Sequence, residues 1–176
     1  MKIINARDNL RDMKSKLEHH LFDEQSIEKS CFLAEESQCG FKGMNPLMAR
    51  DNTIYVAIDD VLQDDIMGCV AVEKSRFFCP FPNPASNRYK LHTLCVNSNT
   101  RGKGVGTQLV GHVLNSLPHA STVYLTVCCP TPKNTKNKYA TAILHMRYDK
   151  LVRLYEVMGF KQIQCYNGYL WMQHHI

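Results

Sequence analysis

The feature of this sequence that most restricts its fold is a change of hydrophobic period near residue 50. Before that point, apolar residues recur every three or four positions over about 9–21 and 24–37, as in amphipathic helices. After it, short apolar runs over 53–58 and 66–72 are typical of strands. The sequence therefore predicts two helices early in the chain and a sheet built mainly from its later part.

The remaining segments continue this alternation of strands and helices. Further strands are expected over 1–5, 90–96, 122–128, 160–165 and 169–173, helices over 105–117 and 147–158, and loops over 79–87 and 130–140. Asn167 and Gly168 are a strong signal for a tight hairpin between the last two strands. The order β-α-α-β-β-β-α-β-α-β-β predicts an α+β fold, with a mixed, mostly antiparallel central sheet flanked by helices.

Length and composition indicate a single domain over residues 1–176, because no repeat or linker-like segment divides the chain. The eight cysteines are scattered and form no CxxC pair, so no metal site is expected. The amino-terminal segment lacks the apolar stretch of a secretion signal, and no apolar run is long enough to cross a membrane. We therefore expect a cytoplasmic protein without a membrane partner, either a monomer or a homodimer.

The formal net charge of +5 has two interpretations. It is either an ordinary solvated surface with a basic excess or a means of attracting a polyanionic ligand. Nucleic acid is not the expected partner, because the Lys and Arg residues form no dense stripe and no aromatic platform accompanies them.

A glycine-rich loop between an expected strand and an expected helix is the motif that best indicates a function. It consists of Arg101, Gly102, Lys103, Gly104, Val105 and Gly106. The glycines let the backbone approach a ligand closely, and the free N–H groups at the helix start suit a pyrophosphate. A Walker A loop is excluded because Thr107 and Gln108 stand where its Lys and Ser/Thr would follow. The dinucleotide fingerprint fails at its third glycine, where Thr107 stands.

The pattern R-x-x-G-x-G in this loop resembles the pyrophosphate loop of the GNAT superfamily of acetyl-CoA-dependent N-acetyltransferases. The apolar strand over 91–96 resembles the segment that leads into that loop, and residues 154–160, LYEVMGF, resemble the family's second signature. The resemblance implies acetyl-CoA as cosubstrate and no metal. It assigns coenzyme binding to Leu94, Cys95, Val96, Arg101, Gly102, Lys103, Gly104, Val105, Gly106 and Thr107. Backbone N–H groups around Leu94 to Val96 would also stabilise the oxyanion.

His92 is the candidate general base. An amine with a pKa near 10.4 must lose its proton before it attacks a thioester, and histidine titrates near neutrality. Arylalkylamine acetyltransferases, which this region resembles, carry a histidine at this point. Alternatively, His92 is a strand residue with a structural hydrogen bond, and a glutamate or a chain of water molecules elsewhere removes the proton.

Tyr155 is the candidate acid. The departing coenzyme A thiolate needs a proton, and the family resemblance places a tyrosine at this position for that role. Alternatively, Tyr155 is a core residue, because Leu151, Leu154, Tyr155 and Met158 are all expected on the inward face of the last helix.

Two features depart from the family pattern. Tyr148 stands where many members have an asparagine that contacts the coenzyme. The connection from Cys129 to Arg147 is longer than usual and carries Lys133, Lys136 and Lys138. We interpret this connection as a loop without a role. Alternatively, it covers the acceptor site or binds the 3′-phosphate of the coenzyme. Cys128 and Cys129 are expected to be structural, with a redox role as the alternative.

Three functions remain open at this point. The first is acetylation of a small primary amine, such as an arylalkylamine, a polyamine or an aminoglycoside. The second is acetylation of a protein or peptide amine, and the third is a module that binds acetyl-CoA without turnover. The sequence contains no motif that identifies the acceptor.

Overall fold

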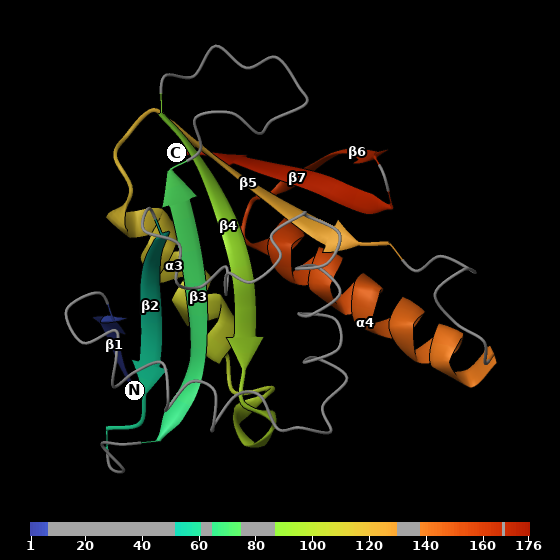
Figure 1. Ribbon diagram of the computed structural model, residues 1–176, viewed down its shortest axis with the longest axis horizontal. Coiled ribbons are helices and arrows are strands. Elements are labelled where there is room, and N and C mark those ends of the chain that lie inside the picture. Colours follow the sequence, from blue (N-terminus) through green and yellow to red (C-terminus); the bar gives the residue numbers. More distant parts are fainter. Residues whose placement is uncertain (7–51, 61–64, 75–86, 130–137, 167) are drawn as a thin grey trace, which may run out of the picture. The chain divides into compact units, whose positions relative to one another are not determined.

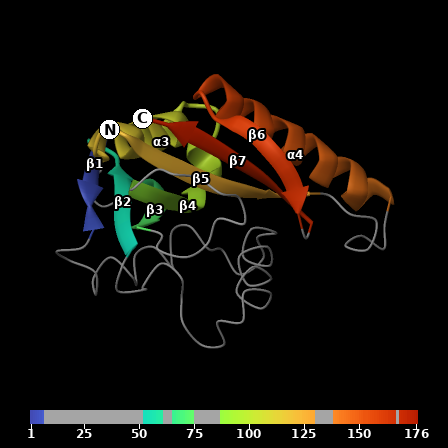
Figure 2. The ribbon, with the colours of Figure 1, turned by 90° about the horizontal axis from the view of Figure 1, so that it is seen from above.

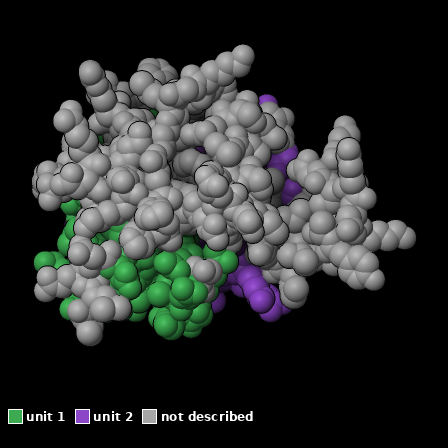
Figure 3. Space-filling model, turned by 60° about the horizontal axis from the view of Figure 1, so that its bottom comes forward, with its two compact units in different colours: residues 1–74, 91–116 green, residues 75–90, 117–176 purple. Residues whose placement is uncertain are grey.

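The computed structural model describes residues 1–6, 52–60, 65–74, 87–129, 138–166 and 168–176. The elements in these ranges are β1 (Lys2–Asn5), β2 (Asn52–Ile58), β3 (Ile66–Lys74), β4 (Asn87–Val96), the 3-10 turn η3 (Ser98–Thr100), α3 (Val105–Ser116), β5 (Ser121–Cys128), α4 (Lys138–Val157), β6 (Lys161–Tyr166) and β7 (Tyr169–His175) (Figure 1). The chain divides into two compact units, one of residues 1–74 and 91–116, the other of residues 75–90 and 117–176 (Figure 3). β4 contributes residues to both.

The strands of the first unit follow the order β1-β2-β3-β4. β1 pairs antiparallel with β2, which places Lys2 opposite Ile58, and β2 pairs antiparallel with β3, which places Asn52 opposite Glu73. β4 lies beside β3 and runs in the opposite direction (Figure 1). α3 packs against β2 and β3. The strands predicted over 1–5, 53–58 and 66–72 and the helix predicted over 105–117 are therefore confirmed.

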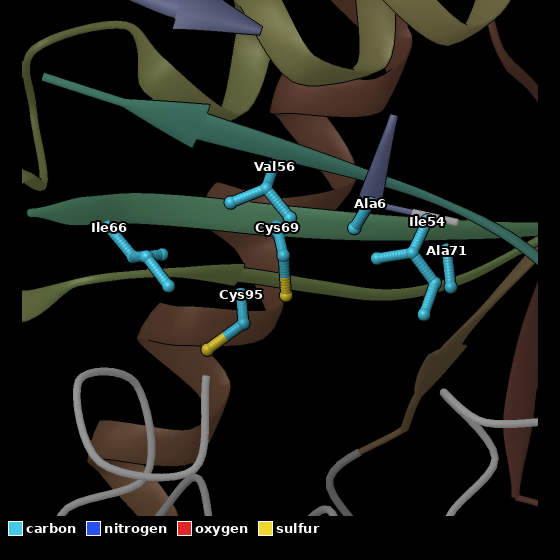
Figure 4. Packing of buried hydrophobic residues seen from close by; sticks show 7 residues of the cluster. All are labelled: Ala6, Ile54, Val56, Ile66, Cys69, Ala71 and Cys95. Atoms are coloured by element: carbon cyan, nitrogen blue, oxygen red, sulfur yellow. The ribbon is translucent and has the colours of Figure 1, made fainter. Parts of the chain in front are cut away.

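Apolar side chains fill both faces of these strands. The residues that α3 buries are Val105, Leu109, Val110 and Val113, at the spacing of one helix face. A second cluster consists of Ala6, Ile54, Val56, Ile66, Cys69, Ala71 and Cys95 (Figure 4). Because side chains alternate along a strand, Gly68 faces α3 while Cys69 faces this second cluster. The two faces of β3 contact different partners. A slip of the strand by one residue would turn every side chain toward the wrong partner, so the register is fixed.

Gly68 allows β3 to approach β4 and α3 more closely than any other residue would. A Cβ atom at this position would lie 2.7 Å from the carbonyl oxygen of Cys95 and 3.2 Å from Cδ1 of Leu109. Since one of the two contacts is with backbone, a side chain at Gly68 would displace β4. The glycine therefore helps to determine where the last residues of β4 lie.

The strands of the second unit follow the order β4-β5-β7-β6. The first residues of β4 pair in parallel with β5, with Asn87 opposite Ser121. β5 pairs antiparallel with β7, and β7 pairs antiparallel with β6. α4 packs against β5 and β6 and lies along one face of these strands (Figure 2). The observed fold is thus α+β with mixed, mostly antiparallel strands, as predicted.

The hairpin between β6 and β7 has the geometry that its sequence predicts. Tyr166 pairs with Tyr169, so two residues connect the strands. Gly168 has a φ of 81°, in the left-handed region that a tight hairpin turn requires. Asn167 lies outside the described residues.

The start of the last helix was predicted wrongly. α4 begins at Lys138 and not near residue 147, so part of the long connection expected to be a loop is helical. Between residues 138 and 157 there is no Gly or Pro, and Ala140, Ala142 and Leu144 favour helix strongly. The inward face also differs, because Leu151 is 40% exposed whereas Val152 is buried.

Several expectations fall outside the described residues. These are the helices over 9–21 and 24–37, the loop over 79–86 and the first part of the 130–140 loop. The single domain over 1–176 stays a prediction.

Candidate active site

The loop that follows β4 is fixed at its base to the start of β3. The backbone N–H of Asn97 donates to the carbonyl of Met67 at 2.8 Å, and the hydroxyl of Thr100 donates to the same carbonyl at 3.0 Å. The side-chain oxygen of Asn97 accepts a hydrogen bond from the N–H of Asn99 at 3.0 Å. These bonds hold η3 in place, so the glycines begin from a defined position.

Two glycines of the loop have backbone conformations that other residues rarely adopt. Gly102 has a φ of 79° and Gly104 a φ of 77°. Among the described atoms, a Cβ atom at Gly102 would meet none within 4 Å, and one at Gly104 would meet only Nε2 of Gln108, at 3.8 Å. The glycines are therefore required by the backbone and not by crowding. Among the described residues, the space directly beside Gly102 is unfilled.

The first turn of α3 directs N–H groups into the same region. The N–H of Gln108 donates to the carbonyl of Gly104 at 3.0 Å, so the N–H groups of Val105, Gly106 and Thr107 precede the first i to i−4 bond. No acidic residue lies in this turn. The partial positive charge of the helix start is therefore not neutralised locally, which suits an anion.

Arg101 and Lys103 add positive charge at the edge of the loop. Both side chains are exposed. Nε of Arg101 donates to the carbonyl of Val96 at 3.1 Å, which ties the guanidinium to the end of β4. The glycines, the helix start and these cations together fit a polyanion of the size of a pyrophosphate.

The end of β4 lies against the start of α3. A Cβ atom at Gly106 would lie 3.6 Å from Cγ2 of Val96 and 3.7 Å from Cδ2 of Leu94. Cys95 lies between these residues in sequence, and its side chain belongs to the second apolar cluster, near Cys69 (Figure 4). Burial, and secondly Cys95, raise the pKa of the Cys69 thiol well above its usual value. Cys69 is consequently a protonated, buried thiol at neutral pH.

Tyr155 lies in the second unit, on the buried face of α4. Its side chain is 6% exposed, and its ring packs edge-to-face on Phe160 with centroids 5.7 Å apart. The N–H of Phe160 donates to the carbonyl of Tyr155 at 3.0 Å, and Gly159, with a φ of 87°, turns the chain between them. The turn within the LYEVMGF segment thus places Phe160 against the ring of Tyr155 and fixes its orientation.

The structure brings together the predicted residues of the coenzyme loop, and the two predicted catalytic residues belong to different units. Residues 94–96 and 101–107 share the first unit, whereas Tyr155 belongs to the second. His92 lies within β4, in the first unit, and its side chain lies outside the described residues. The roles of Tyr155 and His92 therefore stay predictions.

Two polar features of the second unit were missed by the sequence analysis. The ring of His174 packs on Phe160 with centroids 5.3 Å apart, and its Nδ1 is buried without a hydrogen-bond partner among the described residues. Burial, together with Cys129, raises the pKa of Tyr148 to about 12. No local pattern predicts these contacts, because each joins residues that are distant in the sequence.

A family comparison agrees with this geometry. The profile of the acetyltransferase (GNAT) family matches residues 17–160, which is most of the chain. The chain belongs to the GNAT family. Membership confirms the resemblance inferred from the glycine loop and the LYEVMGF segment, and it makes the protein a GNAT acetyltransferase. No curated protein matches the sequence closely enough to narrow this further.

Solved GNAT structures share the fold at low sequence identity. An aminoglycoside 6'-N-acetyltransferase complexed with coenzyme A is 20% identical with a TM-score of 0.57, over 99% of this chain and 96% of that chain. A GNAT acetyltransferase from Staphylococcus aureus Mu50 is 15% identical with a TM-score of 0.59, over 98% and 97%. Arabidopsis thaliana Naa50, in complex with the bisubstrate analogue CoA-Ac-MVNAL, is 18% identical with a TM-score of 0.53, over 99% and 98%.

Two further observations concern the described part of this GNAT chain. Its His, Cys, Asp and Glu side chains form no group of three or more that could hold a metal ion. Neither of its described helices combines the length and apolar character needed to cross a bilayer.

Proposed function

We propose that the protein transfers the acetyl group of acetyl-CoA to the primary amine of a small molecule, by direct attack of the amine within a ternary complex. The observation that carries this proposal is the loop after β4. Gly102 and Gly104 have positive φ, and the first turn of α3, with N–H groups that are unpaired within the helix, follows them. This is a preformed binding site for the pyrophosphate of coenzyme A.

The coenzyme-binding residues are those of the loop and of the strand that leads into it. The backbone N–H groups of residues 102–107 would hold the pyrophosphate, with Arg101 and Lys103 adding charge. The backbone of Leu94, Cys95 and Val96 would pair with the pantetheine arm as an added strand does. The N–H groups of the same strand would stabilise the developing oxyanion. Bound acetyl-CoA supplies the reactive thioester, and this chain's residues orient it and move the protons.

Two side chains are proposed to move protons. His92, near the end of β4, would accept the proton of the ammonium group and leave a free amine. Tyr155 would donate its phenolic proton to the departing thiolate. Its burial and its packing on Phe160 support this role, because a fixed ring presents the hydroxyl in one orientation.

A peptide or protein amine is the second candidate acceptor. It is favoured by the likeness to Naa50, which was solved with an analogue containing the peptide MVNAL. The likeness to an aminoglycoside acetyltransferase favours the small-molecule acceptor. A module that binds acetyl-CoA without turnover is the third candidate.

The experiment measures release of free thiol from acetyl-CoA with aryl and alkyl amines, polyamines, aminoglycosides and short peptides. We expect turnover with a small amine. Tyr155→Phe should lower kcat about 100-fold, the scale of a lost general acid, because the ring packing is retained. Exposed Tyr166 is the matched control, and Tyr166→Phe should leave kcat unchanged.

His92→Ala tests the base and should lower kcat most near neutral pH, where the amine is still protonated and a histidine can accept its proton. Turnover with peptides alone would replace the small-molecule acceptor by a protein. Coenzyme binding by calorimetry without turnover would favour the non-catalytic module, and no binding at all would contradict the proposed coenzyme site.

A further inference from the structure

Three reactive side chains of the second unit meet outside the residues assigned above. Sγ of Cys129 and Sγ of Cys165 are 3.7 Å apart. The hydroxyl of Tyr148 shares a hydrogen bond with the sulfur of Cys129, and its pKa also responds to Cys165. Cys129 follows β5, Cys165 lies on β6 and Tyr148 lies on α4, so the fold alone brings them together.

The backbone holds the two thiols in this arrangement. The N–H of Cys129 donates to the carbonyl of Gly168 at 2.8 Å, which joins the end of β5 to the turn between β6 and β7. On the other side, Cys165 pairs with Leu170 of β7. Both cysteines are therefore anchored by backbone pairing to β7 and its turn, and their side chains meet from either side of that strand.

The pair is also accessible. Cys165 is exposed and Cys129 is half-buried. A disulfide bond is about 2.05 Å long, so the sulfur atoms need to approach by less than about 2 Å. β6 is the outermost strand of its unit and pairs, among the described strands, with β7 only. It can accommodate such a shift without breaking a second set of strand hydrogen bonds.

We propose that Cys129 and Cys165 are a modification site at which a peroxide converts two thiols into an intramolecular disulfide. The thiolate of the exposed Cys165 attacks one peroxide oxygen, which gives a sulfenic acid and one water. The thiolate of Cys129 then attacks that sulfur and displaces the second water. Two thiols lose two electrons and two protons in total, and one hydrogen peroxide takes them up as two molecules of water.

Tyr148 supports the second step. Its side chain forms a hydrogen bond with that of Cys129. A phenol that donates to a thiolate stabilises it, and the thiolate is the nucleophilic form. The resulting bond would link the end of β5 covalently to β6, across the intervening β7.

Cys69 and Cys95 provide an internal control. They are also close neighbours in space, but both are buried, and burial raises the pKa of Cys69 far above neutrality. A peroxide at neutral pH should therefore leave them unmodified while Cys129 and Cys165 react.

The test treats the full chain with hydrogen peroxide at neutral pH, followed by alkylation and non-reducing peptide mapping. We expect a Cys129–Cys165 cross-linked peptide, a mass loss of two hydrogen atoms and reversal by dithiothreitol. Cys129→Ser and Cys165→Ser should each abolish the cross-link. Tyr148→Phe should slow its formation several-fold, and Gln164→Ser on the same strand should leave the rate unchanged.

A cross-link that uses Cys128 or another cysteine in place of Cys129, sulfinic acid at Cys165 without a cross-link, or no reaction would each overturn the proposal. Because the readout follows thiols and not acetyl transfer, it is independent of the proposed function. Circular dichroism of each variant shows that its fold is retained.

Discussion

At the scale of single residues, the candidate coenzyme site depends on backbone conformation more than on side chains. Gly102 and Gly104 have positive φ and no close neighbours among the described atoms, so substitution there tests conformation with no steric clash. Gly111, within α3, also has open space around it but ordinary helical φ. These glycines form a matched set.

We expect Gly104→Ala to lower the free energy of unfolding by about 1 kcal/mol, because an L-residue is strained at positive φ. Coenzyme A affinity should fall as well, because relief of the strain moves the N–H groups of the loop. Gly111→Ala should have the opposite sign and stabilise the protein by about 1 kcal/mol through helix propensity. Urea unfolding and calorimetry measure both effects. Equal affinity of Gly104→Ala and the parent would remove the loop from the binding site.

Tyr148 makes stability depend on pH in the alkaline range. Its pKa is raised to about 12, above the value near 10 of an unfolded tyrosine, so the folded protein retains the proton more strongly. The associated stability is complete below pH 10 and is lost as pH rises towards 12. The difference in unfolding free energy between the parent and Tyr148→Phe should therefore decrease over that range. A difference that stays constant from pH 8 to 12 would contradict this assignment.

Functional residues could be predicted from the sequence only where they lie close together in it. The glycine loop could be recognised, because three alternating glycines between a strand and a helix are typical of a phosphate-binding turn. The bonds that fix its base could not be predicted, since Asn97 and Thr100 reach Met67, which is distant in sequence. The contact of Cys129 with Cys165 was missed for the same reason, although a redox role for Cys129 is one of the two interpretations that the sequence allows.

At the scale of elements, the junction between α4 and β6 is as constrained as the loop. Gly159 combines a φ of 87° with a steric limit, because a Cβ atom there would lie 2.9 Å from the ring of His174. Gly168, in the β6–β7 turn, has a similar φ of 81° but no neighbour within 4 Å.

Substitutions at Gly159 and Gly168 distinguish backbone strain from steric crowding. Gly168→Ala should cost about 1 kcal/mol of stability, from φ alone. Gly159→Ala should cost about 1–3 kcal/mol more, because the new methyl group must displace His174 and disturb its packing on Phe160. Chemical denaturation measures both values. If the two substitutions cost the same, His174 yields freely and the contact does not constrain the junction.

The start of α4 was predicted less accurately than α3 and the strands, for a physical reason. The strands are short apolar runs bounded by turn residues, so their ends are marked in the sequence. Lys138, the first residue of α4, directly follows the polar sequence of residues 130–137, so no single cap or turn signal marks where the helix begins. The exposure of Leu151 shows the same limit, because the helix face that is buried depends on where β5 and β6 lie.

At the scale of the whole molecule, β4 is the element common to both units. Its residues from Leu91 onward lead to the coenzyme loop in the first unit, while its earlier residues pair with β5 in the second. One strand that serves both units predicts that they unfold together.

The single tryptophan makes this prediction measurable. Trp171 lies on β7, in the second unit, whereas the coenzyme loop lies in the first. Coenzyme A at 100 times its dissociation constant stabilises the folded state by about 2.7 kcal/mol. If unfolding is cooperative, the midpoint followed by Trp171 fluorescence should rise by about 5–10 °C, equally with that from circular dichroism. A fluorescence midpoint unaffected by coenzyme A would show that the units unfold separately.

The contact at Gly68 has a consequence for any attempt to evolve this enzyme towards a new acceptor. A randomised library selected for acetyl transfer should retain glycine at codon 68, because even alanine pushes against the carbonyl of Cys95. Codon 111 should diversify freely in the same library. Position 68 would then stand out as invariant without touching coenzyme or amine, and a mutational map alone would mistake a limit on chain spacing for a catalytic requirement.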